Sequence, residues 1–373
     1  MKKQIIILFF FIIQVPSWSQ KLIKTNGPCT QEKCWKANGK WIKSGDDISP
    51  YLNFSKPQQQ EALKRLNAVH DLLLKIYPEP TGVDAVWGTS LGNGHFGSLA
   101  KYSVNSDGQI RFDYLKEVLT PSLKWGCGFP GYYCANDKEN TMMAGYTNET
   151  GTAITIFANN LDWFASSPQD DSMTVNHLPV KMKNPVKEMW KGYELLNSPG
   201  GSNTRYILVS RKGMLPYVPV TRKQYLDYCV NYITKLYDKM MADIEIYQPD
   251  KEQRNRQKNE MLKQKNGALK SYRDELEKTR AAKLLDSPAI VVSMTPGMGI
   301  GMGDTRIFIT EAEGGQMLVT DSPGYLRKDL PKYVPQFFVL AWSWESPSGP
   351  DDNIRKIIEA KFPVEKLQAM IDK

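Results

Sequence analysis

Histidine is scarce in this chain, with only His70, His95 and His177 among 373 residues. Imidazole is the most common protein ligand for transition metals and a frequent general base, so the scarcity argues against a histidine-rich metal site. His70 also lies within a helical pattern, where a structural role is expected.

Long apolar runs are lacking after the first 20 residues. Lys2 and Lys3 precede nine apolar residues, 5–13, and Pro16 and small residues up to Ser19 follow. A membrane-spanning helix needs about 20 apolar residues. The pattern therefore predicts a signal peptide over residues 1–19. We expect an exported protein, periplasmic or secreted, with no transmembrane segment after signal removal.

A dominant charge of one sign is also lacking, since 48 Lys and Arg face 40 Asp and Glu, giving a formal net charge of +8. A nucleic-acid-binding protein concentrates basic residues on one face, often with aromatic residues between them. Here the excess is spread along the chain, so we expect no nucleic-acid partner. The hydrophobic content of 41% suffices for a substantial core.

Cysteine is rare but locally paired. Cys29 and Cys34 lie in "CTQEKC", and Cys127 and Cys134 lie in "CGFPGYYC". In an exported protein such pairs usually form disulfides, and their spacings are wider than those of a zinc ribbon. We predict the bonds Cys29–Cys34 and Cys127–Cys134, with Cys229 as a buried free thiol in a helix.

The order of patterns along the chain predicts an α+β fold with a mainly antiparallel sheet. Leu262, Leu269 and Leu276 recur every seven residues, which indicates a partly coiled-coil hairpin of two long helices. The stretch "TRIFIT" and the residues after it, 305–312, alternate as a strand does. The expected regions are a loop-rich N-terminal segment with a disulfide (20–54), an α+β region that opens with a helix (55–220), the helical hairpin (221–287), and returning strands with a C-terminal helix (288–373) in the same domain as 55–220.

A glycine- and methionine-rich stretch, "SMTPGMGIGMGD", precedes that predicted strand. A phosphate-binding loop requires a helix after it, so this reading is excluded. Met294, Met298 and Met302 carry thioethers that suit Cu(I), which leaves copper handling as a lesser alternative. A flexible connecting loop is the favoured interpretation, and we expect no cofactor.

A second motif, "GTSLG", matches the nucleophile elbow G-x-S-x-G of hydrolases. Ser90 would be the nucleophile, with His95 or His177 as its base. More glycine and another strand follow instead of a helix, so a β-turn is favoured. A serine hydrolase remains the alternative function.

Four aromatic residues cluster in the second cysteine segment, namely Trp125, Phe129, Tyr132 and Tyr133. Rigid aromatic side chains on a loop closed by a disulfide form a good contact surface for a protein or glycan partner. The competing interpretation is that these rings pack onto the sheet. The leading hypothesis is a non-catalytic binding protein that recognises its partner through this loop or through the helical hairpin.

Overall fold

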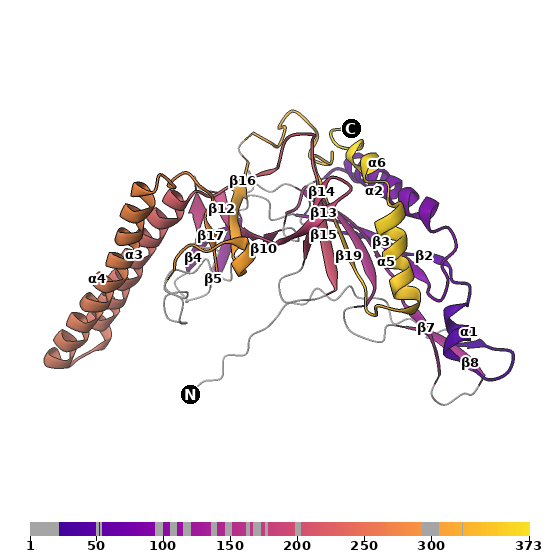
Figure 1. Cartoon of the computed structure of the whole chain (residues 1–373), viewed down its shortest axis with the longest axis horizontal. Helices are drawn as coiled ribbons and strands as arrows, with labels where there is room; N and C mark the ends of the chain where they lie inside the picture. The colour runs from indigo at the N-terminus through magenta and orange to yellow at the C-terminus, as the bar shows by residue number, and fades with distance from the viewer. Residues whose placement is uncertain are drawn as a thin grey trace.

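The computed structural model describes residues 22–49, 52, 54–93, 100–104, 110–114, 121–135, 140–145, 151–161, 165–166, 173–175, 178–197, 203–292, 306–322 and 324–373. The fold is α+β, with mostly antiparallel sheets, an early helix and a long helical hairpin inserted mid-chain (Figure 1). The fold class expected from the sequence is confirmed. Among the described helices, none has the length and apolar composition needed to cross a membrane.

An eight-stranded sheet forms the centre of the fold, and all its neighbouring strands are antiparallel except β2 and β3. Strand β19 lies between β9 and β15, so a strand from after the hairpin completes a sheet begun before it. The strands in spatial order are β13 (Val186–Trp190), β14 (Tyr193–Asn197), β15 (Thr204–Val209), β19 (Phe338–Ser343), β9 (Ala153–Ala158), β6 (Pro121–Gly128), β3 (Ala85–Asn93) and β2 (Trp41–Ile48).

Three helices pack against one face of this sheet: α2 (Lys56–Ile76), α5 (Gly349–Lys361) and α6 (Val364–Gln368). Side chains alternate across a strand, and β19 shows the consequence. Leu340 belongs to the core under the helices, whereas its neighbour Val339 belongs to a second core on the opposite face. Both faces of the sheet are therefore buried at β19.

A second sheet covers that opposite face. Its strand β18 divides two cores, because Val319 contacts the core of the large sheet and Leu318 contacts the core beneath the helical hairpin. The strands are β10 (Ala165–Ser166), β12 (Leu178–Lys183), β18 (Gln316–Asp321) and β16 (Tyr217–Pro219), with β11 (Thr174–Val175) beside β12 and β17 (Ile290–Val291) beside β18.

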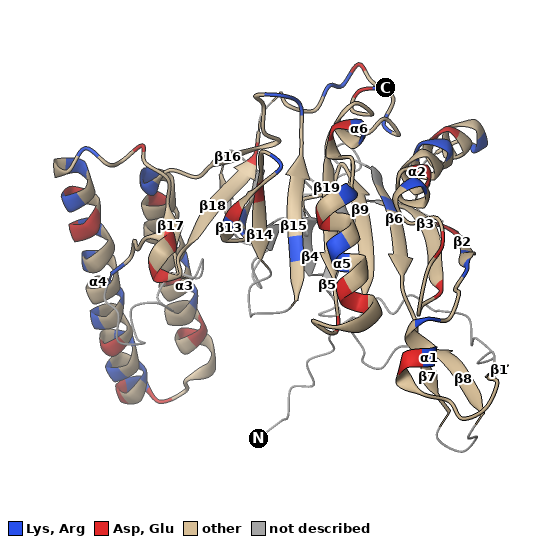
Figure 2. Cartoon of the chain, turned by 45° about the vertical axis from the view of Figure 1, so that its right-hand side comes forward, with Lys and Arg blue, Asp and Glu red and all other residues tan. Residues whose placement is uncertain are grey.

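The helical hairpin consists of α3 (Arg222–Tyr247) and α4 (Lys251–Ala281), and it extends away from the sheets (Figure 1). Thr221 begins α3 by accepting a hydrogen bond from the Gln224 backbone N–H at 3.2 Å. The buried contacts lie near the base of the hairpin and include Cys229, which is a buried free thiol as predicted. Farther out, Ile246 is 71% exposed. Figure 2 shows charges of both signs along the two helices.

A small N-terminal layer combines helix α1 (Gln31–Trp35) with the three-stranded sheet β1 (Leu22–Lys24), β8 (Thr141–Gly145) and β7 (Gly131–Cys134). Strands β4 (Ala100–Val104) and β5 (Ile110–Tyr114) form a separate hairpin.

The prediction of a strand over residues 305–312 is wrong for residues 306–312, which are the part of this range that the structure describes. Residues 306–310 form no strand, and Glu311–Glu313 form the short 3₁₀ helix η1. Strand β18, the next strand in sequence, lies inside its sheet and already pairs with β12, β16 and β17.

Candidate functional site

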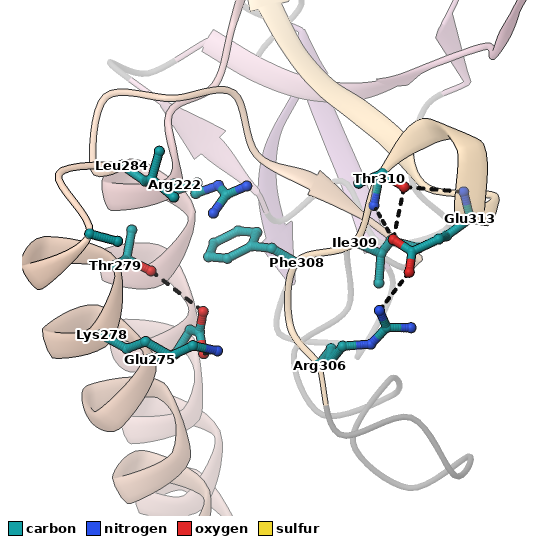
Figure 3. Close-up of a pocket in the computed structure, with 11 residues that line it drawn as sticks. Arg222, Glu275, Lys278, Thr279, Leu284, Arg306, Phe308, Ile309, Thr310 and Glu313 are labelled. Atoms are coloured by element: carbon teal, nitrogen blue, oxygen red, sulfur yellow. Dashed lines mark hydrogen bonds and ion pairs between the residues drawn. The ribbon is translucent and has the colours of Figure 1, made fainter.

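A cavity of about 290 Å³ lies at the base of the helical hairpin (Figure 3). Three segments form its walls: the first residue of α3, the last two turns of α4 with the residues after it, and residues 306–313. The backbone N–H of Arg222 donates to the Ser287 carbonyl at 2.9 Å, and that of Lys223 donates to Leu285 at 3.0 Å. These bonds attach the start of α3 to the chain that leaves α4.

Arg222 is the central feature of the cavity. Its guanidinium lies over the ring of Phe308, with 4.7 Å between Cζ and the ring centroid (Figure 3). Its Nε is buried and has no hydrogen-bond partner among the residues that the structure describes. A buried polar group without a partner is costly, and one that carries charge is more costly still. Arg222 therefore has unused capacity to donate hydrogen bonds.

The other two cations that line the cavity have carboxylate partners. Arg306 Nη1 lies 2.6 Å from Glu313 Oε1, and Lys278 Nζ lies 3.3 Å from Glu275 Oε2. The Arg306 guanidinium, helped by hydrogen bonds from Thr310, lowers the pKa of Glu313 to about 2. Glu313 thus stays ionised and engaged with Arg306. Among the described residues that line the cavity, Arg222 is left as the cation without a carboxylate partner.

This arrangement suits an anion with an apolar part. A guanidinium presents a planar set of donors that matches a carboxylate or phosphate in a two-bond geometry. Phe308, Ile309 and Leu284 supply apolar surface beside it. The volume is at the lower end of the range for ligand pockets, which fits a small organic acid or one acidic group of a larger partner.

Sequence reasoning missed both Arg222 and Phe308. One signal was available, because Arg222 directly follows the helix cap Thr221. Positive charge in the first turn of a helix is unfavourable next to the positive end of the helix dipole. No local signal identifies Phe308 as its neighbour, because the whole hairpin lies between them in sequence.

The stretch around Ser90 does not form the nucleophile elbow on which the alternative function depends. The residues from Gly88 to Gly92 lie within β3, where Ser90 pairs with Asp47 of β2 and Lys124 of β6. A residue in the middle of a strand is not at the sharp strand-to-helix turn that exposes an elbow serine. The favoured β-turn is wrong for the same reason. His95 and His177 lie outside the described residues.

Three of the four aromatic residues that were predicted to form a contact surface are buried instead. Trp125 and Phe129 are buried in the core under α2, and Tyr132 is buried with its hydroxyl donating to Asp84 Oδ1 at 2.6 Å. The segment forms strands β6 and β7 instead of a loop, so its side chains alternate into the core. Tyr133 remains half-buried.

Tyr132 and Tyr133 also line a second depression, of about 210 Å³. Asp351 lies in its wall, where the Thr152 hydroxyl donates to the carboxylate. Burial, reinforced by the charge of Glu345, raises the pKa of Asp351. This wall is acidic, in contrast to the cavity at Arg222.

The predicted disulfide pairing is wrong. Cys29 bonds to Cys134, and Cys34 and Cys127 are buried free thiols. Cys127 lies in β6, within the core of the large sheet, whereas β7 carries Cys134 into the small N-terminal layer beside α1. Closeness in sequence therefore did not place Cys127 and Cys134 together. Met294, Met298 and Met302 lie outside the described residues.

Comparison with known proteins finds no family model, no curated protein and no solved structure that matches the chain.

Proposed function

We propose that this chain is a non-catalytic binding protein that takes the carboxylate of a partially apolar ligand into the cavity at the base of the hairpin. The observation that carries the proposal is the unpartnered, buried Nε of Arg222, whose guanidinium lies on Phe308 inside the cavity. A carboxylate there would gain charge-assisted hydrogen bonds from the guanidinium. The cavity lies at the base of the helical hairpin, one of the two elements that the sequence suggested for partner recognition.

Binding is favoured over catalysis by the low pKa of Glu313, the carboxylate nearest to a hydroxyl in the cavity. The Thr310 hydroxyl donates to Glu313 Oε2 at 2.8 Å, which is the arrangement of a hydroxyl nucleophile and its base. A carboxylate with a pKa of about 2 is a very weak base at neutral pH. The pair instead begins η1, since the Glu313 N–H donates back to the Thr310 hydroxyl.

The test observes Arg222 directly. In a protein labelled with ¹⁵N-arginine, the Arg222 Nε–Hε signal is assigned by its loss in Arg222→Lys. Phenylacetate, which joins a carboxylate to a ring, should shift this signal in a saturable way, and neutral phenylacetamide should not. Arg222→Gln lacks this signal, so its binding is measured by isothermal titration calorimetry beside the wild type. It should bind phenylacetate at least tenfold more weakly, because hydrogen bonds to charged groups contribute about 1.5–3 kcal/mol.

Arg273 provides the matched control, because it is exposed on α4 and does not line the cavity. Arg273→Gln should bind phenylacetate as the wild type does. A titration with phenyl phosphate compares the two classes of anion. If the protein clearly prefers phenyl phosphate to phenylacetate, the proposed ligand group is a phosphate instead of a carboxylate. If neither anion shifts the Arg222 Nε–Hε signal, the proposal is refuted.

We further propose that the protein is exported, with its mature chain beginning at Gln20. Support comes from the signal-like start and from the Cys29–Cys134 disulfide, since disulfides are typical of oxidising compartments. Intact-mass analysis of the secreted and envelope fractions tests this, and a cellular protein that retains Met1 contradicts it.

A further inference from the structure

Three cysteine sulfurs meet in the small N-terminal layer. Cys34 Sγ lies 3.5 Å from Cys29 Sγ and 3.8 Å from Cys134 Sγ, and the latter two form the disulfide. Cys34 is fully buried, and the cluster comes from three places in the chain: the loop before α1, α1 itself and the end of β7. The tertiary fold thus holds three sulfurs at the corners of one triangle.

Thiol–disulfide exchange does not suit this triangle. A thiolate displaces a disulfide sulfur along the S–S axis, so the far sulfur would lie about 2 Å farther from the attacking sulfur than the near one. Here the two distances differ by only 0.3 Å (3.8 − 3.5). Cys34 therefore lies beside the bond and not at its end.

The same triangle suits a metal ion. Thiolate sulfurs bound about 2.3 Å from a d¹⁰ metal ion lie roughly 3.8–4.0 Å apart. Two of the three separations are already close to this range, and only the bonded pair must part. The group consists of cysteines alone, with no histidine or carboxylate among its members in the described parts of the chain. Met142 pairs with Cys134 across β7 and β8 and belongs to the same buried cluster.

We propose that reduction of the Cys29–Cys134 disulfide creates a Cu(I) site in which Cys29, Cys34 and Cys134 are the ligands. Soft sulfur donors favour Cu(I), and three of them complete a trigonal site, whereas zinc sites usually complete four ligands. A trialkylphosphine supplies the two electrons that break the S–S bond. It becomes the phosphine oxide, with water providing the oxygen and two protons. Binding of Cu(I) then releases the thiol protons to solvent.

This site is independent of the cavity at Arg222, and it is testable on the full chain. The protein is reduced with a phosphine without oxygen and then titrated with Cu(I) against bicinchoninate, a chromophoric Cu(I) chelator. The reduced wild type should bind one Cu(I), and the oxidised wild type should bind none. Cys34→Ser should lower the affinity at least 100-fold, whereas Cys229→Ser, which changes a buried thiol elsewhere, should leave it unchanged.

Controls address folding and the other sulfur donors. Cys34→Ser can fold with the disulfide intact before reduction, and circular dichroism follows both states. X-ray absorption should show three sulfur neighbours around copper. Replacing Met294, Met298 and Met302 with leucine should have no effect. The proposal is overturned if the reduced wild type does not compete with bicinchoninate, if folded Cys34→Ser binds equally well, if the methionine variant loses binding, or if Zn²⁺ displaces the copper.

Discussion

The Arg222 guanidinium lies over the ring of Phe308, with 4.7 Å between Cζ and the ring centroid, and this contact joins the start of the helical hairpin to the segment that precedes η1. Contacts of this kind hold a cation in place without neutralising it, because the ring face offers a quadrupole instead of a charge. The guanidinium is thereby oriented while its Nε makes no hydrogen bond to the described segments.

Replacing Phe308 with leucine should keep most of the apolar wall and remove the ring face. We expect phenylacetate affinity to fall about two- to thirtyfold, since cation–π contacts contribute about 0.5–2 kcal/mol. Tyr247→Leu, at a side chain 79% exposed near the far end of the hairpin, is the control and should not change binding. The Arg222 Nε–Hε titration measures both variants, and equal affinities would show that the ring does not orient Arg222.

His70 should make the protein less stable as pH falls. It is buried and stacks on Trp87 at 3.9 Å, and within the described part of the chain its Nδ1 has no hydrogen-bond partner. Burial lowers its pKa below 6.5, with the charge of Lys43 adding to the effect and that of Asp71 opposing it. The unfolded chain therefore binds a proton below about pH 6.5 that the folded chain resists, so stability is lost as pH falls through this window.

His70→Phe removes this titration and keeps an aromatic ring in the core. Urea unfolding at several pH values between 7.5 and 5.5 should show a smaller loss of unfolding free energy for the variant than for the wild type. Parallel pH profiles for the two proteins would mean that His70 does not contribute.

The ion pair between Arg211 and Asp372 should stabilise the packing of the C-terminal residues. Its Nε and Nη2 donate to both carboxylate oxygens of Asp372 at 2.7 and 2.6 Å, and further donations reach Gln336 and the Tyr325 carbonyl. Both charged side chains are mostly buried. Arg211→Gln should lower the free energy of unfolding by about 2–4 kcal/mol, because it leaves a partly buried carboxylate unpaired.

Arg327 offers the matched comparison. It also donates two bonds to one carboxylate, that of Asp329, but this pair is largely exposed. Arg327→Gln should cost no more than about 0.5 kcal/mol. Denaturant unfolding measures the loss of unfolding free energy in Arg211→Gln and Arg327→Gln. Similar losses would show that burial does not strengthen the Arg211–Asp372 pair.

Two glycines should respond to alanine in opposite directions. Gly267 lies within α4, and an added Cβ would meet no described atom within 4 Å. Gly267→Ala should raise stability by about 0.5–1 kcal/mol through helix propensity. Gly82 has a φ of +75°, and a Cβ there would lie 2.5 Å from Pro350 Cγ. Gly82→Ala should therefore destabilise the protein, and thermal unfolding checks both signs.

Non-reducing peptide mapping should find Cys29 joined to Cys134, with Cys34, Cys127 and Cys229 alkylated only after unfolding. The bond closes a loop between residues 105 apart in sequence. Replacing both of its cysteines with serine should cost about 2–4 kcal/mol. Recovery of a Cys29–Cys34 peptide in the native protein would contradict the structure.

Local patterns in the sequence determined the helices, because caps and helical spacing act between residues close together in the chain. The helix that opens with Ser55, and the hairpin that opens with Thr221, follow from caps and from apolar residues at helical spacing, so their positions were predictable. The α+β class follows from the order of these elements. The buried thiol at Cys229 was predictable too, because it lies on the apolar face of its helix.

Only the tertiary structure decided which distant residues meet. The strand-like alternation at 306–310 did not produce a strand, since a strand also needs a free partner edge. Cys134 reached Cys29 because β7 pairs with β8 beside α1, and Cys127 was taken into a different core. Arg222 and Phe308 meet because α3 and α4 return the chain to its starting point. Contacts of this kind depend on which surfaces are left to pack together, and no local pattern in the sequence carries that information.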